Sequence, residues 1–286
     1  MNLITKYSLI IQVSLISFFS YGQNYYMNKN GKSYFGLTGG VNYTIPKVTD
    51  SYSVLTSVEG DEAGIYEKKY DKFGLNRAVQ FGIRYNYNFK FGYSIVADFV
   101  YQAQSFGYFT DYSWSDTINN QDFEREMHHL QKVSYFSFPL MVRLDFTKSQ
   151  FMPYVQAGMF MDFRHQAKKV INYDNSIDSK ETENQLSSSS EVSITDFIQK
   201  FNMGLTGGAG IQYHTKFATF GLESNFRFGF MKVVNDDMRY SDVNGFALQY
   251  LDVFDQLKWR NLNFNITVSI PISNGVAMNV LRKRQY

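Results

Sequence analysis

The fold is decided by the stretch NRAVQFGIRYNYNF, residues 76–89. Every second position from Val79 to Phe89 is apolar or aromatic, and the positions between them are glycine or polar residues such as Gln80 and Arg84. Successive side chains of a β-strand point to opposite faces. This period of two therefore predicts a strand with one apolar and one polar face.

Seven further segments alternate in the same way, and short and long connections follow one another between them. A transmembrane β-barrel produces this pattern because one side of each strand meets lipid and the other meets a polar lumen. The 27 Phe and 22 Tyr fit the aromatic girdles of such barrels. The sequence predicts an all-β fold, an eight-stranded antiparallel up-and-down transmembrane β-barrel over residues 34–272. The other strands are expected at residues 34–45, 93–104, 136–146, 152–163, 203–213, 220–230 and 261–270.

The connections predict which end of the barrel faces which side of the membrane. Residues 90–92, 147–150 and 215–216 are expected to be tight turns, with Gly92 supplying the left-handed residue of a three-residue hairpin loop. Such barrels keep short turns in the periplasm and long loops outside. We therefore expect both termini to be periplasmic. The long extracellular loops are expected at residues 46–75, 107–130, 164–200 and 232–258; their acidic residues outnumber the basic ones, and the serine run 187–190 is expected to be mobile.

The start of the chain predicts export. Lys6 precedes an apolar run at residues 7–19, and small residues follow at Ser20 and Gly22. Residues 1–22 are interpreted as a signal peptide, followed by a periplasmic N-terminal segment at residues 23–33. The chain has no cysteine, which removes disulfides and thiol catalysis, and its net charge of +2 is too small to favour nucleic acid as a partner.

Charged residues recur on the predicted lumen face. An eight-stranded barrel is just wide enough inside for side chains, so these charges should pair with one another. The three-residue turn places Arg84 across from Asp98. In the last tight hairpin, matching faces place Glu223 opposite Gly208 and Arg227 opposite Gly204, so these glycines are expected to make room for long charged side chains. A packed polar plug is the favoured interpretation, and an ion or proton path is the alternative. The predicted lumen network comprises Arg84, Asp98, Arg143, Asp145, Asp162, Glu223 and Arg227.

Four strand motifs carry a family resemblance. The segments YFGLTGGVNY at 34–43, FSFPLMVR at 136–143, MPYVQAG at 152–158 and GLTGGAGI at 204–211 resemble the PorT-like outer-membrane β-barrel proteins of Bacteroidota. The resemblance covers nearly the whole mature chain. It implies an outer-membrane location and, for the founding member of the family, participation in type IX secretion and gliding. It offers no catalytic motif to transfer.

Three groups of His and acidic residues are candidates for a catalytic or metal site, and solvated loops are the alternative interpretation of each. Adjacent His128 and His129 lie near Asp122, Glu124 and Glu126, but consecutive strand positions point to opposite faces. Two further groups, Asp236 with Asp237 and Asp242, and His165 with Asp162, lack the spacing of a calcium loop or a hydrolase. We therefore expect no enzyme activity, no cofactor and no metal site.

Two functional hypotheses remain from the sequence. The favoured one is a non-catalytic structural or interaction barrel of an envelope complex, with a link to type IX secretion, and the alternative is a small-solute or ion transporter. The expected surroundings are outer-membrane lipid and lipopolysaccharide, and the expected partner is another envelope or secretion protein. Residues 273–286 are predicted to form a periplasmic basic tail, either disordered or a tether. Its candidate partner-binding residues are Val280, Leu281, Arg282, Lys283 and Arg284.

Overall fold

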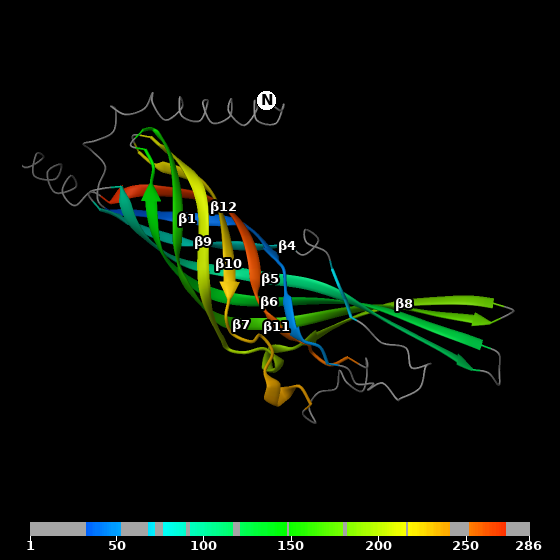
Figure 1. Cartoon of the computed structure of the whole chain (residues 1–286). Helices are drawn as coiled ribbons and strands as arrows, with labels where there is room; N and C mark the ends of the chain where they lie inside the picture. Colours follow the sequence, from blue (N-terminus) through cyan, green and yellow to red (C-terminus); the bar gives the residue numbers. More distant parts are fainter. Residues whose placement is uncertain are drawn as a thin grey trace, which may run out of the picture.

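A computed structural model describes most of the chain between residues 33 and 272 (Figure 1). The predicted signal peptide, N-terminal segment and basic tail lie outside the described residues. No helix in the described part of the chain is long and apolar enough to cross a membrane. The described ranges are 33–52, 68–71, 77–89, 92–116, 121–147, 149–179, 182–215, 217–240 and 252–272.

Eight strands form a closed antiparallel ring in which each strand pairs with its neighbours in the order β1, β4, β5, β6, β7, β9, β10, β12 and back to β1. Sequence neighbours are also neighbours in the ring, so the predicted eight-stranded antiparallel up-and-down barrel is confirmed. Because the ring closes, no strand within it has an unpaired edge. Strands in lipid need this closure, since no water is present there to bind unpaired backbone groups. The ring strands are β1 (Ser33–Thr44), β4 (Arg77–Asn88), β5 (Tyr93–Asp116), β6 (Gln121–Asp145), β7 (Phe151–Ser179), β9 (Phe201–His214), β10 (Thr219–Gly229) and β12 (Arg260–Ile272).

The two faces of the ring differ as the alternation predicts. Outward side chains such as Phe81 and Ile266 are 60% and 63% exposed, whereas their inward neighbours Gln80 and Asn265 are buried. Apolar residues of this kind surround the ring and form an apolar belt. A soluble protein seldom exposes so large an apolar surface, and lipid would cover it in a membrane protein.

One tight turn agrees with the prediction and a second agrees only in part. Gly92 has φ +79° and ends the turn at residues 90–92. The turn between β9 and β10 spans residues 215–218, where the Ala218 amide donates to Thr215 Oγ1 at 3.0 Å. The expected tight turn around residues 215–216 is present, but it is longer than the predicted strand pairing requires, and the Thr215 side chain holds it. Glu223 consequently lies opposite Gly210, and Arg227 opposite Thr206, two positions away from the predicted partners.

Two of the expected long loops are largely β-structure. Strands β5 and β6 remain paired out to Asp116 and Gln121, and β7 continues to Ser179, where it pairs with β8 (Thr182–Ser193). The prediction of irregular loops over most of 107–130 and 164–200 is therefore wrong, and the serine run 187–190 lies within β8. Beyond the apolar belt these strands lack the alternation of apolar and polar residues by which the ring strands were predicted. Figure 1 shows β5 to β8 projecting from the ring as one sheet, here called the projecting sheet.

A second core lies at the long-loop end of the ring. Loop residues pack onto the inward faces of β5, β6 and β7 just beyond the polar lumen, and Trp259 Nε1 donates to Tyr135 Oη at 2.9 Å. The loops contain two short helices, η1 (Thr195–Phe197) and η2 (Asp236–Met238). Strand β2 (Lys47–Asp50) pairs with β11 (Gln256–Lys258), and β3 (Lys69–Tyr70) pairs with β5. We call this apolar cluster the loop-end core; it includes Phe106, Val133, Tyr135, Ile171, Ile194, Phe197, Val233, Phe254, Leu257 and Trp259.

Candidate functional site: the polar lumen and the loop-end charge cluster

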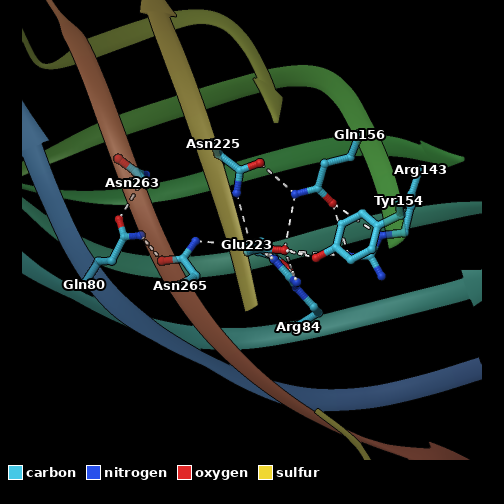
Figure 2. A network of polar contacts seen from close by, with 10 residues as sticks. Gln80, Arg84, Arg143, Tyr154, Gln156, Glu223, Asn225, Asn263 and Asn265 are labelled. Carbon is cyan, nitrogen blue, oxygen red and sulfur yellow. Dashed lines mark hydrogen bonds and ion pairs between the residues drawn. The ribbon is translucent and has the colours of Figure 1, made fainter. Parts of the chain in front are cut away.

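Arg84 on β4 lies between the carboxylates of Asp98 and Glu223 inside the ring. Figure 2 shows its contact with Glu223. Its Nε and Nη2 donate to Asp98 at 2.8 and 2.7 Å. Its Nη1 and Nη2 also donate to Glu223 at 2.8 and 2.7 Å. The predicted register of Arg84 against Asp98 is confirmed. Glu223, which approaches from β10 across the lumen, was missed as a partner of Arg84 because sequence spacing fixes only neighbouring strands.

Glu223 is the acceptor at which polar side chains from several strands meet (Figure 2). Tyr154 Oη donates to it at 2.8 Å, and the amide groups of Asn225 and Asn265 each donate at 3.1 Å. Arg143 Nη2 lies 3.8 Å away, and its guanidinium stacks 4.0 Å from the centre of the Tyr154 ring. A buried carboxylate with this many donors is held in one position, so the network locks β4, β7, β10 and β12 together.

Arg227 forms a second cluster nearer the long-loop end. Its Nη2 donates to Asp162 at 2.7 Å and to Ser137 at 3.0 Å, and its Nη1 donates to Gln102. The guanidinium also lies 3.8 Å from the centre of the Phe160 ring. The cluster joins β5, β6, β7 and β10 across the lumen.

Asp145 makes no side-chain hydrogen bond or ion pair with either cluster among the described residues, although it was predicted to belong to the lumen network. It is only partly buried at the tight-turn end, where its backbone amide donates to the Gly92 carbonyl at 2.9 Å. Its Oδ1 has no hydrogen-bond partner among the described residues. The last residue of a strand is beside the turn, so its side chain reaches the rim instead of the lumen centre.

The lumen is filled. Glycines on β9 make room for rings on β7 and for Asn225 and the backbone of β10, and not, as predicted, for the charged side chains of β10. A Cβ at Gly210 would lie 2.5 Å from the Tyr154 ring, and one at Gly204 would lie 2.7 Å from the Phe160 ring. A cavity lined by polar groups that include Asp98 has a volume of about 30 Å³. That is room for roughly two water molecules.

A buried charge cluster in the loop-end core was not found from the sequence. Asp252 accepts from Tyr108 Oη at 2.7 Å and pairs with Lys169 Nζ, and Lys68 Nζ lies 3.2 Å from Asp252 and 3.1 Å from Asp255. Lys169 and Asp252 are fully buried, so each charge depends on the other. The cluster ties the loop at 252–255 to β5 and β7. Its members lie far apart in the chain, and only their shared position beyond the lumen brings them together.

His129 lies beside this cluster, beyond the apolar belt. Its Nε2 is 2.8 Å from Thr110 Oγ1, and its Nδ1 is 3.9 Å from Asp252. Burial and then the nearby charge of Lys169 lower the pKa of His129 from 6.5 to about 3. The imidazole is therefore neutral at physiological pH and acts as a hydrogen-bonding member of a packed core.

The candidate metal groups are dispersed by the fold. His128 points to the outer face and lies 3.3 Å from Asp71, whereas His129 is buried on the inner face. Asp236 pairs with Lys232 and Arg239, and Asp242 lies outside the described residues. His165 points outward onto the Phe136 ring, away from Asp162. No group of three or more His, Asp or Glu side chains that could hold a metal ion occurs within the described ranges.

A family model described as outer membrane protein β-barrel domain matches residues 21–235. Among solved structures, OprG from Pseudomonas aeruginosa is 14% identical and aligns with 85% of this chain and 97% of its own, with a TM-score of 0.37. Neisserial surface protein A is 11% identical over 86% of this chain and 100% of its own, with a TM-score of 0.36. No curated protein sequence matches.

Proposed function

Since the chain belongs to the outer membrane protein β-barrel domain family, we propose that it is a closed, non-catalytic barrel that holds an interaction surface at the membrane. The observation that carries the proposal is the filled lumen, in which Arg84 joins Asp98 and Glu223 across the ring. A transporter needs a path, and the cavity of about 30 Å³ offers none. A barrel without a path serves best as an anchor.

The projecting sheet is the part that the anchor would present. Strand β8 pairs with β7 along one edge, and no pairing is recorded for its other edge within the described residues. An unpaired strand edge offers a row of backbone donors and acceptors to an extended segment of another protein. We place this sheet, with the acidic loops, outside the cell and both termini in the periplasm. The tight turns at the opposite end support this orientation.

The proposed partner is another protein of the cell envelope. We further propose that this partner belongs to a type IX secretion complex. The PorT-like motifs support this assignment. Crosslinking in intact cells tests the partner: a photoreactive side chain at Ser189 on β8 should give a discrete crosslinked species. The same probe at lipid-facing Leu205 on β9 is the matched control. Equal crosslinking patterns from the two positions would contradict a role for the projecting sheet.

Conductance separates the anchor from the alternative, a small-solute or ion transporter. The full-length protein, reconstituted into planar bilayers at several voltages, should give no stable current steps above the lipid baseline. Reproducible ohmic steps from correctly folded protein would overturn the closed-barrel proposal and favour the transporter. The variant Arg84→Ala tests the plug itself, since loss of the central guanidinium should allow brief openings that the parent lacks.

A further inference from the structure

The outer face of the β6–β7 pair carries basic side chains beyond the apolar belt. Lys132 and Lys168 lie directly opposite each other, and both are exposed. His165 is the extra residue of a β-bulge between them and the belt, and it is also exposed. Its ring lies 5.3 Å from that of Phe136 and 6.3 Å from that of Tyr101. We call Lys132, His165 and Lys168 the outer-face basic patch.

The charge of this patch is only partly compensated. Like charges directly opposite each other on neighbouring strands are unfavourable. Lys168 pairs with Glu191 on β8 at 2.6 Å. Lys132 has no carboxylate within ion-pair distance among the described residues, and its outward strand neighbours Ser105, Leu130 and Ser134 are not acidic. An anion between the two ammonium groups would remove their repulsion.

The patch lies at the height of a lipid headgroup. Tyr101, Phe136 and Phe163 are the last outward aromatic residues on their strands before polar residues begin, and such aromatic girdles mark the membrane interface. Lys132 is four residues beyond Phe136, a distance of about 13 Å along the strand and less in height because barrel strands are tilted. That height is at the outer edge of the headgroup layer, and a long lysine side chain can bring its ammonium group back to a headgroup phosphate.

We propose that the outer-face basic patch binds a phosphate group of the acylated glucosamine glycolipid in the outer leaflet. Phosphate oxygens accept hydrogen bonds from Lys132 and Lys168, and the acyl chains lie along the aromatic residues below. The His165 ring fills the space between the sugar and the girdle. This inference rests on the orientation given above, because the long-loop end must face the outer leaflet.

The test uses the detergent-purified full-length protein with diphosphorylated lipid A, and native mass spectrometry to measure the lipid retained. Two lysines near an anionic headgroup predict that the double variant Lys132→Gln with Lys168→Gln raises the apparent Kd by roughly tenfold or more. The double variant with arginine at both positions should bind as the parent does. Lys232→Gln is the matched control: Lys232 also follows the apolar belt and, like Lys168, is paired with a carboxylate, Asp236 at 3.1 Å, but it does not belong to the outer-face basic patch.

Two further measurements decide whether phosphate on a lipid is recognised. Dephosphorylated lipid A should bind the parent about as weakly as lipid A binds the glutamine double variant. Inorganic phosphate at the same concentration should not displace lipid A. Equal affinity of parent and glutamine variant, equal affinity for the two lipids, or displacement by inorganic phosphate would each overturn the proposal. None of these outcomes depends on conductance or on crosslinking at β8, so a failure here is distinct from a failure of the anchor function.

Discussion

Arg84 shows how a single residue determines the barrel interior. Its guanidinium makes hydrogen bonds to Asp98 on the adjacent strand and to Glu223 across the lumen. All three side chains are buried, so none can exchange its partner for bulk water. Removing Arg84 would leave buried carboxylates without their partner, which is energetically costly. This does not mean that the buried ion pairs are more stable than an apolar core of the same volume.

We predict that Arg84→Ala lowers the free energy of unfolding by about 3 to 5 kcal/mol, because two buried carboxylates lose their common partner. Adding Asp98→Asn should recover part of this loss, and adding Glu223→Gln should recover more. Urea unfolding in detergent micelles, followed by the electrophoretic shift of the heated protein, measures the change. The exposed Arg77 at the start of β4 provides the control, Arg77→Ala. Equal stability of parent and Arg84→Ala would mean that the ion pairs contribute nothing.

His129 gives the loop-end core a predicted pH dependence. Its pKa is lowered to about 3 in the folded chain, against 6.5 as the usual value. Between these values the unfolded chain binds a proton that the folded chain does not, so stability falls as pH decreases from about 6.5 towards 3. Burial raises the pKa of Asp252, but the charges of Lys169 and Lys68 outweigh it and hold this pKa below its usual value. Protonation of Asp252 therefore also lowers the stability, but only at lower pH.

The variant His129→Gln should therefore flatten the stability of the loop-end core between pH 6.5 and about 4. Hydrogen exchange of amides at 252–259 measures this region separately from the barrel. His128→Gln is the matched control, since His128 lies on the outer face and is only partly buried. An unchanged pH slope in His129→Gln would mean that another group produces it.

At the scale of elements, β7 and β8 show that strands of this barrel extend beyond the apolar belt. The apolar belt ends near Phe163, yet β7 continues to Ser179 and pairs with β8 from Lys168 onward. The β-bulge at His165 shifts the register, so the inward positions change from Asp162 and Arg164 to Ala167, Lys169 and Ile171. This change of phase aims Lys169 into the loop-end core.

The tip of this hairpin provides a topology test. Strand β7 ends at Ser179 and β8 begins at Thr182, so Lys180 lies in the connection between them. Trypsin added to intact cells should cut after Lys180, whereas Lys90 in the turn at the opposite end should be protected by the membrane. Mass spectrometry of the fragments reads the result, and Lys180→Gln should remove that cut alone. Cleavage after Lys90 in intact cells would reverse the proposed orientation.

At the scale of the whole molecule, two cores share one inward surface. The polar lumen is held by charged hydrogen bonds, and the loop-end core beyond it is apolar around the Lys169–Asp252 pair. The first core is enclosed by the ring, whereas the second depends on loops that pack onto β5, β6 and β7. The ring should thus keep its fold when a chain end is removed.

Deletion of residues 274–286 tests the predicted tether on this basis. The truncated protein should remain folded and heat-modifiable in the outer membrane, because the ring closes through β1 and β12 before this tail begins. Under the tether hypothesis it should lose its envelope partner in a mild-detergent pull-down. A matched variant that replaces Arg282, Lys283 and Arg284 with Gln tests whether the charge is responsible. Retention of the same proteins by both variants would place the interaction elsewhere.

The sequence by itself determined which residues face lipid and which face the lumen. Successive side chains of a strand point to opposite faces, so the alternation of apolar and polar residues assigns each one to a face without knowledge of the rest of the fold. It also determined the register of Arg84 against Asp98, since a three-residue turn fixes the pairing of its own two strands. Only the tertiary structure decided that Glu223 meets Arg84, that β7 and β8 extend beyond the belt, and that Asp252 reaches Lys169. The contacts of Glu223 with Arg84 and of Asp252 with Lys169 join segments far apart in the chain, and no local rule determines their meeting. Strands β7 and β8 are neighbours in sequence, but the mostly polar sequence of β8 has no alternation of apolar and polar residues that would mark it as a strand.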